Sequence, residues 1–276
     1  MEIIEFNRLL FETAKLPMVK IDRELFLRKE LRGRFKPEVV DKAIEYNPAY
    51  AGISVEDINK IAKSCIIAET IKVTAISAAA GLPGGLAMVG AIPADLTQYF
   101  AHILRIVQEL IYLYGWKQLE FDGTEINQEV ENLLTLFVGI MFGVKGAVGA
   151  INKLGVLVAK QVAKKLPQKA LTKGLVYPIV KKVAGLLGVR MTKQIFSKGV
   201  AQAVPALGAA FSGGLTLATF KPMAERLRKY LASSQLASVE YYKEMADEVI
   251  EDAELLEEIE VVEDIEIIEC VEFLED

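Results

Sequence analysis

The chain has 276 residues, a net charge of -5 and a mean hydropathy of +0.30, but only one His, two Cys and one Trp. This composition leaves little material for a His- or Cys-rich metal site or for a classical catalytic triad. The two cysteines, Cys65 and Cys270, lie far apart and predict a reduced, intracellular chain. The N-terminus lacks a basic segment followed by an apolar one, so we expect no signal peptide.

Charge is strongly segregated along the chain. Residues 132–229 contain sixteen Lys and Arg but one acid, Glu225, whereas residues 237–276 contain seventeen acids but one base, Lys243. The basic, apolar middle predicts a partner with an anionic surface. The acidic tail would compete with that surface for the basic side chains. We expect no cofactor, and no nucleic-acid partner, because few aromatic residues lie among the basic ones.

The first 53 residues predict short helices joined by turns, because Pro37 and Pro48 interrupt helical sequence. We interpret them as a solvated helical cap over the core. Two acidic residues follow Ser54, and the second of them is Asp57. This pattern predicts the N-terminus of a longer helix. Apolar residues continue at helical spacing beyond it.

Residues 78–96 are the stretch least typical of a globular protein, since small apolar residues are interrupted by glycine and proline. Proline lacks a donor and each glycine costs about 1 kcal/mol in a helix, so we predict a helix, a tight turn and a second short segment. Small residues on both arms suit either a membrane helix pair or a closely packed soluble hairpin. Pro93 then suits the first turn of the next helix.

Polar side chains on that next helix fall within one arc of about 120°, at 100° per residue. They are Asp95, Gln98, Tyr99, His102, Arg105 and Glu109. The arc is either an ordinary solvated face or a polar stripe that is buried against another helix or lines a cleft. The candidate catalytic residues are Asp95, His102 and Arg105, with His102 as a general acid or base. We predict no metal site, because Asp95 and His102 lie roughly 10 Å apart along the helix.

The apolar sequence that follows leaves two environments open, a protein core and a bilayer. Residues 133–151 carry one charge, Lys145, and are long enough to cross about 30 Å of hydrocarbon, but four glycines weaken a simple span. Gly139 and Gly143 form a GxxxG pair, which is a helix-packing signal in lipid. The preceding helix ends in an aromatic cluster that suits a core or a membrane interface: Tyr112, Tyr114 and Trp116, with Gly115.

Basic amphipathic sequence dominates residues 153–198 and predicts contact with an anionic membrane surface or a partner. A second glycine-rich apolar run, residues 204–214, precedes a last amphipathic helix. The side chains expected at the membrane or partner contact are Lys145, Lys153, Lys160, Lys164, Lys165, Lys169, Lys173, Lys181, Lys182 and Arg190.

Two blocks of motifs resemble the EcsC family. The first block consists of Ala80-Gly81, Gly84-Gly85, Ala94-Asp95-Leu96 and Tyr114-Gly115, and the second of residues 204–208 ahead of Lys221-Pro222-Met223. The resemblance covers residues 55–230, although Trp116-Lys117 replaces the aromatic and acidic pair that many members carry. It implies a bacterial protein, a possible link to an ABC transporter, and no established catalytic residue. The residues that we assign to the structural motif are Gly81, Pro83, Gly84, Gly85, Pro93, Asp95, Tyr99 and Gly115.

Together these features predict an all-α multi-helix bundle with two Gly-rich apolar helical hairpin segments packed at its centre. We divide the chain into an N-terminal helical segment (1–53), an EcsC-like helical domain (54–236) and an acidic tail (237–276). The favoured function is a non-catalytic, cytoplasmic accessory protein, peripheral on the inner face of the cell membrane. Its basic helices would contact anionic lipid or a membrane protein, and its tail would shield them. The alternatives are a membrane-perturbing effector or toxin that inserts its Gly-rich segments, and a hydrolase or lipid-acting enzyme that uses the Asp95/His102 stripe.

Overall fold

The computed structural model describes residues 3–80, 94–119, 121–122, 125–126, 128–144, 146–152, 179–186 and 205–245. The regular secondary structure of these residues is helical apart from one small antiparallel pair, β1 (Phe121–Asp122) and β2 (Glu125–Ile126). The predicted all-α, multi-helix fold is therefore confirmed. Within the described residues, no helix combines the length and the apolar character that crossing a bilayer requires.

Three short helices open the chain: α1 (Ile3–Ala14), α2 (Arg23–Leu31) and α3 (Pro37–Glu45). The breaks before Pro37 and before Pro48 lie where the sequence predicted, whereas the break between α1 and α2 was not predicted. The three helices do more than cover the core, since the buried ring of Phe6 meets that of Phe100 edge-on at a centroid distance of 6.0 Å. One hydrophobic cluster includes side chains from both sides of residue 53.

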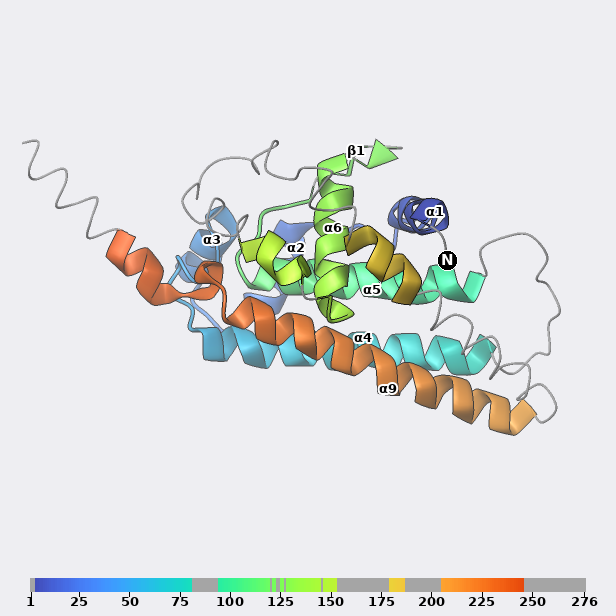
Figure 1. Ribbon diagram of the computed structural model, residues 1–276. Coiled ribbons are helices and arrows are strands. Elements are labelled where there is room, and N and C mark those ends of the chain that lie inside the picture. Colours follow the sequence, from blue (N-terminus) through green and yellow to red (C-terminus); the bar gives the residue numbers. More distant parts are fainter. Residues whose placement is uncertain are drawn as a thin grey trace, which may run out of the picture.

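Three long helices form the body of the molecule: α4 (Val55–Ala80), α5 (Ala94–Leu113) and α9 (Pro205–Ala232). The α4 and α9 helices lie side by side and run in opposite directions (Figure 1). Ser54 begins α4 as predicted, because its Oγ accepts a hydrogen bond of 3.2 Å from the backbone N–H of Asp57. This contact satisfies one of the free donors at the helix N-terminus.

The structure describes most of the second glycine-rich run but little of the first. The second run, residues 204–214, was expected as a separate hairpin segment, but α9 begins at Pro205 and continues through the run without a break. Proline at a first helical position is favourable, and tertiary packing along a long helix can outweigh the roughly 1 kcal/mol cost of each glycine. The first run lies outside the described residues from 81 to 93, and with it Gly81, Pro83, Gly84, Gly85 and Pro93.

The α5 helix ends at Gly115, which has a φ of +98°. The N–H of Trp116 donates to the carbonyl of Ile111 at 2.9 Å, and the N–H of Gly115 donates to that of Tyr112 at 3.3 Å. These two bonds are the Schellman arrangement, which favours glycine at the left-handed position. Tyr112, Tyr114 and Trp116 are all buried here, so the aromatic cluster belongs to the protein core.

The apolar stretch from 133 to 151 is divided between two helices. The α6 helix (Gln128–Met141) ends in the same arrangement, with Gly143 at a φ of +78° and the N–H of Val144 donating to the carbonyl of Gly139. A second helix occupies residues 146–152. The GxxxG pair is thus split by a helix end. Gly139 is a packing position, but Gly143 terminates the helix.

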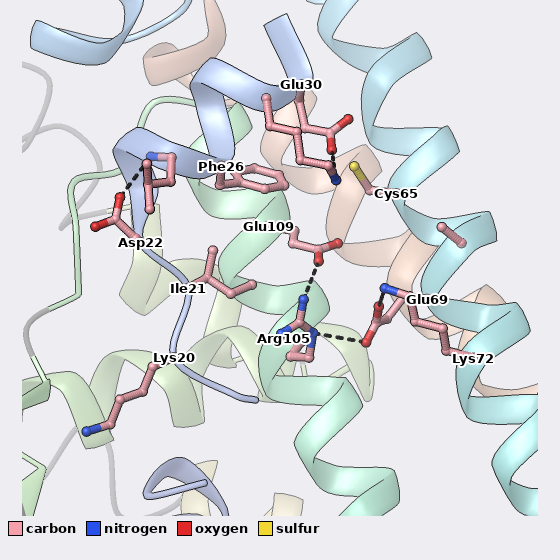
Figure 2. Close-up of a pocket in the computed structure, with 13 residues that line it drawn as sticks. Lys20, Ile21, Asp22, Phe26, Glu30, Cys65, Glu69, Lys72, Arg105 and Glu109 are labelled. Carbon is pink, nitrogen blue, oxygen red and sulfur yellow. Dashed lines mark hydrogen bonds and ion pairs between the residues drawn. The ribbon is translucent and has the colours of Figure 1, made fainter. Parts of the chain in front are cut away.

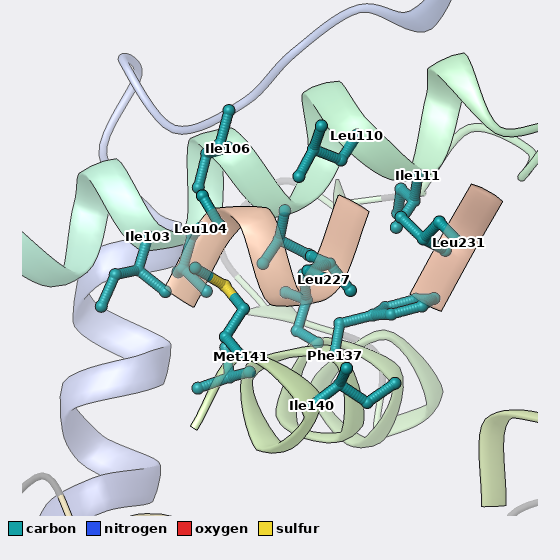
Figure 3. Packing of buried hydrophobic residues seen from close by; sticks show 14 of the residues in the cluster. Ile103, Leu104, Ile106, Leu110, Ile111, Phe137, Ile140, Met141, Leu227 and Leu231 are labelled. Atoms are coloured by element: carbon teal, nitrogen blue, oxygen red, sulfur yellow. The ribbon is translucent and has the colours of Figure 1, made fainter. Parts of the chain in front are cut away.

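The core lies where α5, α6 and α9 meet (Figure 3). Leu110 of α5, Phe137 of α6 and Leu227 of α9 are fully buried there. After α9, the chain passes through the 3-10 turn η1 (Gln235–Ala237) into a helix at residues 239–245. The described fold thus continues past residue 237, where the acidic tail was expected to begin. Its anchor is Tyr242, which is buried and whose hydroxyl accepts a hydrogen bond of 2.8 Å from the amide of Asn47.

Candidate functional site

Part of the polar stripe of α5 is buried against neighbouring helices, which is one of the two interpretations of the sequence, while Gln98 and Arg105 are half-buried. Tyr99, His102 and Glu109 are all buried. The Tyr99 hydroxyl lies 3.2 Å from the hydroxyl of Thr219 on α9. Asp95 lies in the first turn of α5, and its side chain is outside the described part of the structure.

Glu69 of α4 is the centre of a buried ion cluster (Figure 2). Its side chain is 1% exposed, and its Oε1 lies 2.6 Å from Nδ1 of His102 and 3.3 Å from Nε of Arg105. Its Oε2 lies 3.0 Å from Nζ of Lys72, one turn further along α4. The structure therefore joins His102 and Arg105, two of the three candidate catalytic residues, through a carboxylate on a different helix.

These contacts determine the protonation of the cluster. Burial alone raises the pKa of Glu69, but hydrogen bonds from His102 and Lys72 outweigh it and hold that pKa below its usual range. Glu69 is therefore an ionised carboxylate, which can only accept hydrogen bonds, so Nδ1 of His102 carries the hydrogen. The cluster pairs one buried negative charge with several donors, the condition that a buried charge needs.

Glu109 lies one turn beyond Arg105 on α5 and is less well paired. Its Oε1 is 3.4 Å from a guanidinium nitrogen of Arg105, a long contact for an ion pair. Burial, and then the negative charge of Glu69, raise the pKa of Glu109 to about 7, against the opposing effect of Arg105. Near neutral pH this carboxyl is thus half protonated.

Beside the cluster lies a pocket of about 420 Å³ between α2, α4, α5 and the segment before α2. Gln108 of α5 fixes that segment, because its amide donates to the carbonyl of Val19 at 2.8 Å and its Oε1 accepts from the N–H of Ile21 at 3.3 Å. Cys65 lines the pocket, but burial raises the pKa of its thiol and keeps it protonated, so it is no ready nucleophile. The other lining residues include Ile21, Phe26, Glu69, Lys72, Arg105 and Glu109.

The geometry gives His102 a positioning role within the cluster. The pocket is lined by Glu69, Arg105 and Glu109 but not by His102. Nε2 of His102, the atom that a general base would use, is buried and has no hydrogen-bond partner among the described residues. Within the same described part of the chain, no group of three or more His, Cys, Asp or Glu side chains could hold a metal ion.

Glu69 was missed in the sequence, although a signal was present. At 100° per residue it falls in the same arc as Ile66, Thr70 and Val73, which are all buried. An acid at the centre of an apolar face has to be paired to be buried. That position therefore indicated a partner on a facing helix, but not which one.

A second candidate surface lies on the outer face of α4 and α9. Lys63, Ile67 and Ile71 follow one another at intervals of four residues and are exposed, the two isoleucines by 50% and 63%. On α9, Leu217 is 49% exposed and Lys221 is also exposed. Each of the two helices thus exposes both basic and apolar side chains.

The predicted basic contact is only partly described. Lys181 and Lys182 are exposed on the helix at residues 179–186. The others lie outside the described residues: Lys145, Lys153, Lys160, Lys164, Lys165, Lys169, Lys173 and Arg190.

Comparison with known proteins gives no match to a family model, to a curated protein or to a solved structure. The resemblance to the EcsC family therefore stays a prediction.

Proposed function

We propose that this protein binds anionic membrane surfaces peripherally, without catalysis, through one end of the α4/α9 pair and the exposed face of α4 that adjoins it. One observation carries the proposal. Residues 73–94 and 199–220 are two stretches without a single charged side chain. The described parts of both stretches lie at the same end of the molecule, because α4 and α9 are antiparallel (Figure 1). That end therefore combines uncharged, apolar sequence from two distant parts of the chain.

The charge on the adjoining face supports an anionic partner. Beyond Asp57, α4 contains one acid, Glu69, and that acid is buried and paired. The exposed charges on the rest of α4 are therefore lysines. Apolar side chains flanked by lysines are typical of helices that lie in a membrane interface, where the long lysine side chains reach the headgroups.

The magnitudes predict reversible rather than permanent binding. Each lysine near an anionic surface contributes about 1 kcal/mol, and full burial of an exposed isoleucine contributes about 2 kcal/mol. A few such residues give a weak, salt-sensitive affinity. This agrees with a protein that approaches a membrane without crossing it.

Cosedimentation with vesicles tests the proposal. The full chain is mixed with vesicles of phosphatidylcholine, or of an equal mixture of phosphatidylcholine and phosphatidylglycerol, at low and high salt. We expect binding to the anionic vesicles only, and loss of binding at high salt. The double variant Ile67→Ser/Ile71→Ser should bind less. Leu25→Ser is the matched control, because Leu25 is 68% exposed and belongs to α2 rather than to α4 or α9.

Two further arms separate the alternatives. Removal of residues 246–276 should strengthen vesicle binding if the acidic sequence competes with lipid, while the described fold up to residue 245 is kept. Release of a trapped dye from the same vesicles would favour the membrane-perturbing alternative. If neither the full chain nor the shortened one sediments with anionic vesicles at low salt, the proposal is wrong.

A further inference from the structure

The pocket between α2, α4 and α5 contains equal numbers of acidic and basic side chains, but they are not equally paired (Figure 2). Lys29 contacts Glu30 at 2.8 Å, and Lys72 contacts Glu69 at 3.0 Å. Arg105 contacts two carboxylates and also donates to the carbonyl of Met18. The basic side chains at these contacts are thus already directed at oxygen atoms of the protein.

Among the acids, Glu109 has the weakest pairing. Asp22 accepts a hydrogen bond of 2.8 Å from the N-terminal turn of α2, and Glu30 and Glu69 have the partners given above. Among the residues that the structure describes, Glu109 pairs only with Arg105, at 3.4 Å, and it shares that guanidinium with Glu69. A buried carboxylate with one long, shared contact can accept further donors.

The pocket walls also carry apolar side chains beside Glu109. Phe26 and Ile21 lie on one side of it and Cys65 on the other (Figure 2). An aromatic ring beside a carboxylate favours a ligand that is both cationic and partly apolar, because the ring face attracts a cation and the ring covers alkyl groups.

We propose that this pocket binds a small alkylamine-type ligand, whose ammonium group donates to Glu109 and whose hydrocarbon part lies against Phe26 and Ile21. The proposal does not depend on membrane binding, because the pocket residues differ from Ile67, Ile71 and Leu217. An anionic ligand is disfavoured, since it would have to compete with Glu69 and Glu109 for Arg105 and Lys72.

Binding should depend on pH. Since the ammonium pairs with the ionised form of Glu109, whose pKa is about 7, affinity should rise from about pH 6 to about pH 8. The charged or titratable groups that line the pocket with Glu109 come from all its walls: Lys20, Asp22, Lys29, Glu30, Cys65, Glu69, Lys72 and Arg105.

Calorimetric titration of the full chain tests the site with three probes of equal length, n-butylamine, butyrate and butan-1-ol. We expect butylamine to bind most tightly at about pH 8. Glu109→Gln should weaken butylamine binding by about tenfold to hundredfold, which is the usual effect of losing a hydrogen bond to a charged group. Glu24→Gln is the matched control, because Glu24 is an exposed acid of α2 that does not line the pocket, and it should leave binding unchanged.

Several results would overturn the proposal. They are no measurable butylamine binding, equal or tighter binding of butyrate, and an unchanged affinity in Glu109→Gln. The thermal midpoint of each variant, measured without ligand, ensures that a loss of binding is not a loss of folding.

Discussion

Replacement of Glu109 by glutamine should stabilise the protein, and more so at high pH. The folded-state pKa of Glu109 is about 7, whereas its ordinary value is 4.5. A raised pKa means that the folded state favours the protonated carboxyl. The contribution of Glu109 to the free energy of unfolding is fully present below pH 4.5 and is lost as the pH rises through 7. At 1.36 kcal/mol per pKa unit, the ionised carboxylate costs the folded state about 3 kcal/mol.

Glutamine imitates the protonated carboxyl at every pH, so it removes this cost. We expect Glu109→Gln to exceed the wild type in the free energy of unfolding by about 3 kcal/mol at pH 8.5, but by only about 1 kcal/mol at pH 5. Urea unfolding followed by far-ultraviolet circular dichroism at both pH values measures the difference.

The control is Glu12→Gln, on the exposed surface of α1. It should change the free energy of unfolding by less than about 0.5 kcal/mol at either pH. A Glu109→Gln variant that is destabilised equally at both pH values would refute the reasoning, because it would show that ionised Glu109 is well paired in the folded state.

Five further substitutions test the turns and close contacts of the fold by thermal unfolding. Gly115→Ala should cost about 2–4 kcal/mol, because φ is +98° and the new Cβ would lie 2.8 Å from a carbonyl oxygen of η1. Gly52→Ala, with φ +83° and no atom within 4 Å, should cost only about 1 kcal/mol. Gly139→Ala should lower the free energy of unfolding by about 1–3 kcal/mol, because the new Cβ would lie 3.0 Å from the helix at 146–152. Gly149→Ala has no atom within 4 Å of its new Cβ, so it should raise the free energy of unfolding by about 0.5–1 kcal/mol. Tyr242→Phe should cost about 1 kcal/mol, since it removes the acceptor of a buried amide N–H.

Local signals in the sequence predicted much of the fold. The N-terminus of α4 at Ser54 follows from a hydroxyl beside two acids, and that signal acts over one helical turn. The arc of polar residues on α5 follows from helical periodicity alone. Both predictions concern one helix at a time, which is why they needed no knowledge of neighbouring helices.

Features that depend on two helices could not be predicted in this way. GxxxG spacing at Gly139 and Gly143 indicated one packing face, but whether the helix continues past Gly143 depends on the contacts available to the next turn. Residues 204–214 contain enough glycine to weaken a helix, yet α9 continues through them. Helix propensity alone therefore does not decide such cases, because the contacts that a neighbouring element offers can outweigh it.

The position of Glu69 connects the buried cluster with the outer surface of α4. A buried ion cluster is weak support for stability, because the cost of removing charges from water offsets most of their attraction. Stability alone therefore does not explain an acid at this position. Its inward position has two other effects: it occupies Arg105 and Lys72, which leaves Glu109 poorly paired, and it removes the only negative charge of α4 beyond Asp57 from the exposed face. The same side chain thus supports the proposed amine pocket on one side of α4 and the proposed lipid-binding face on the other.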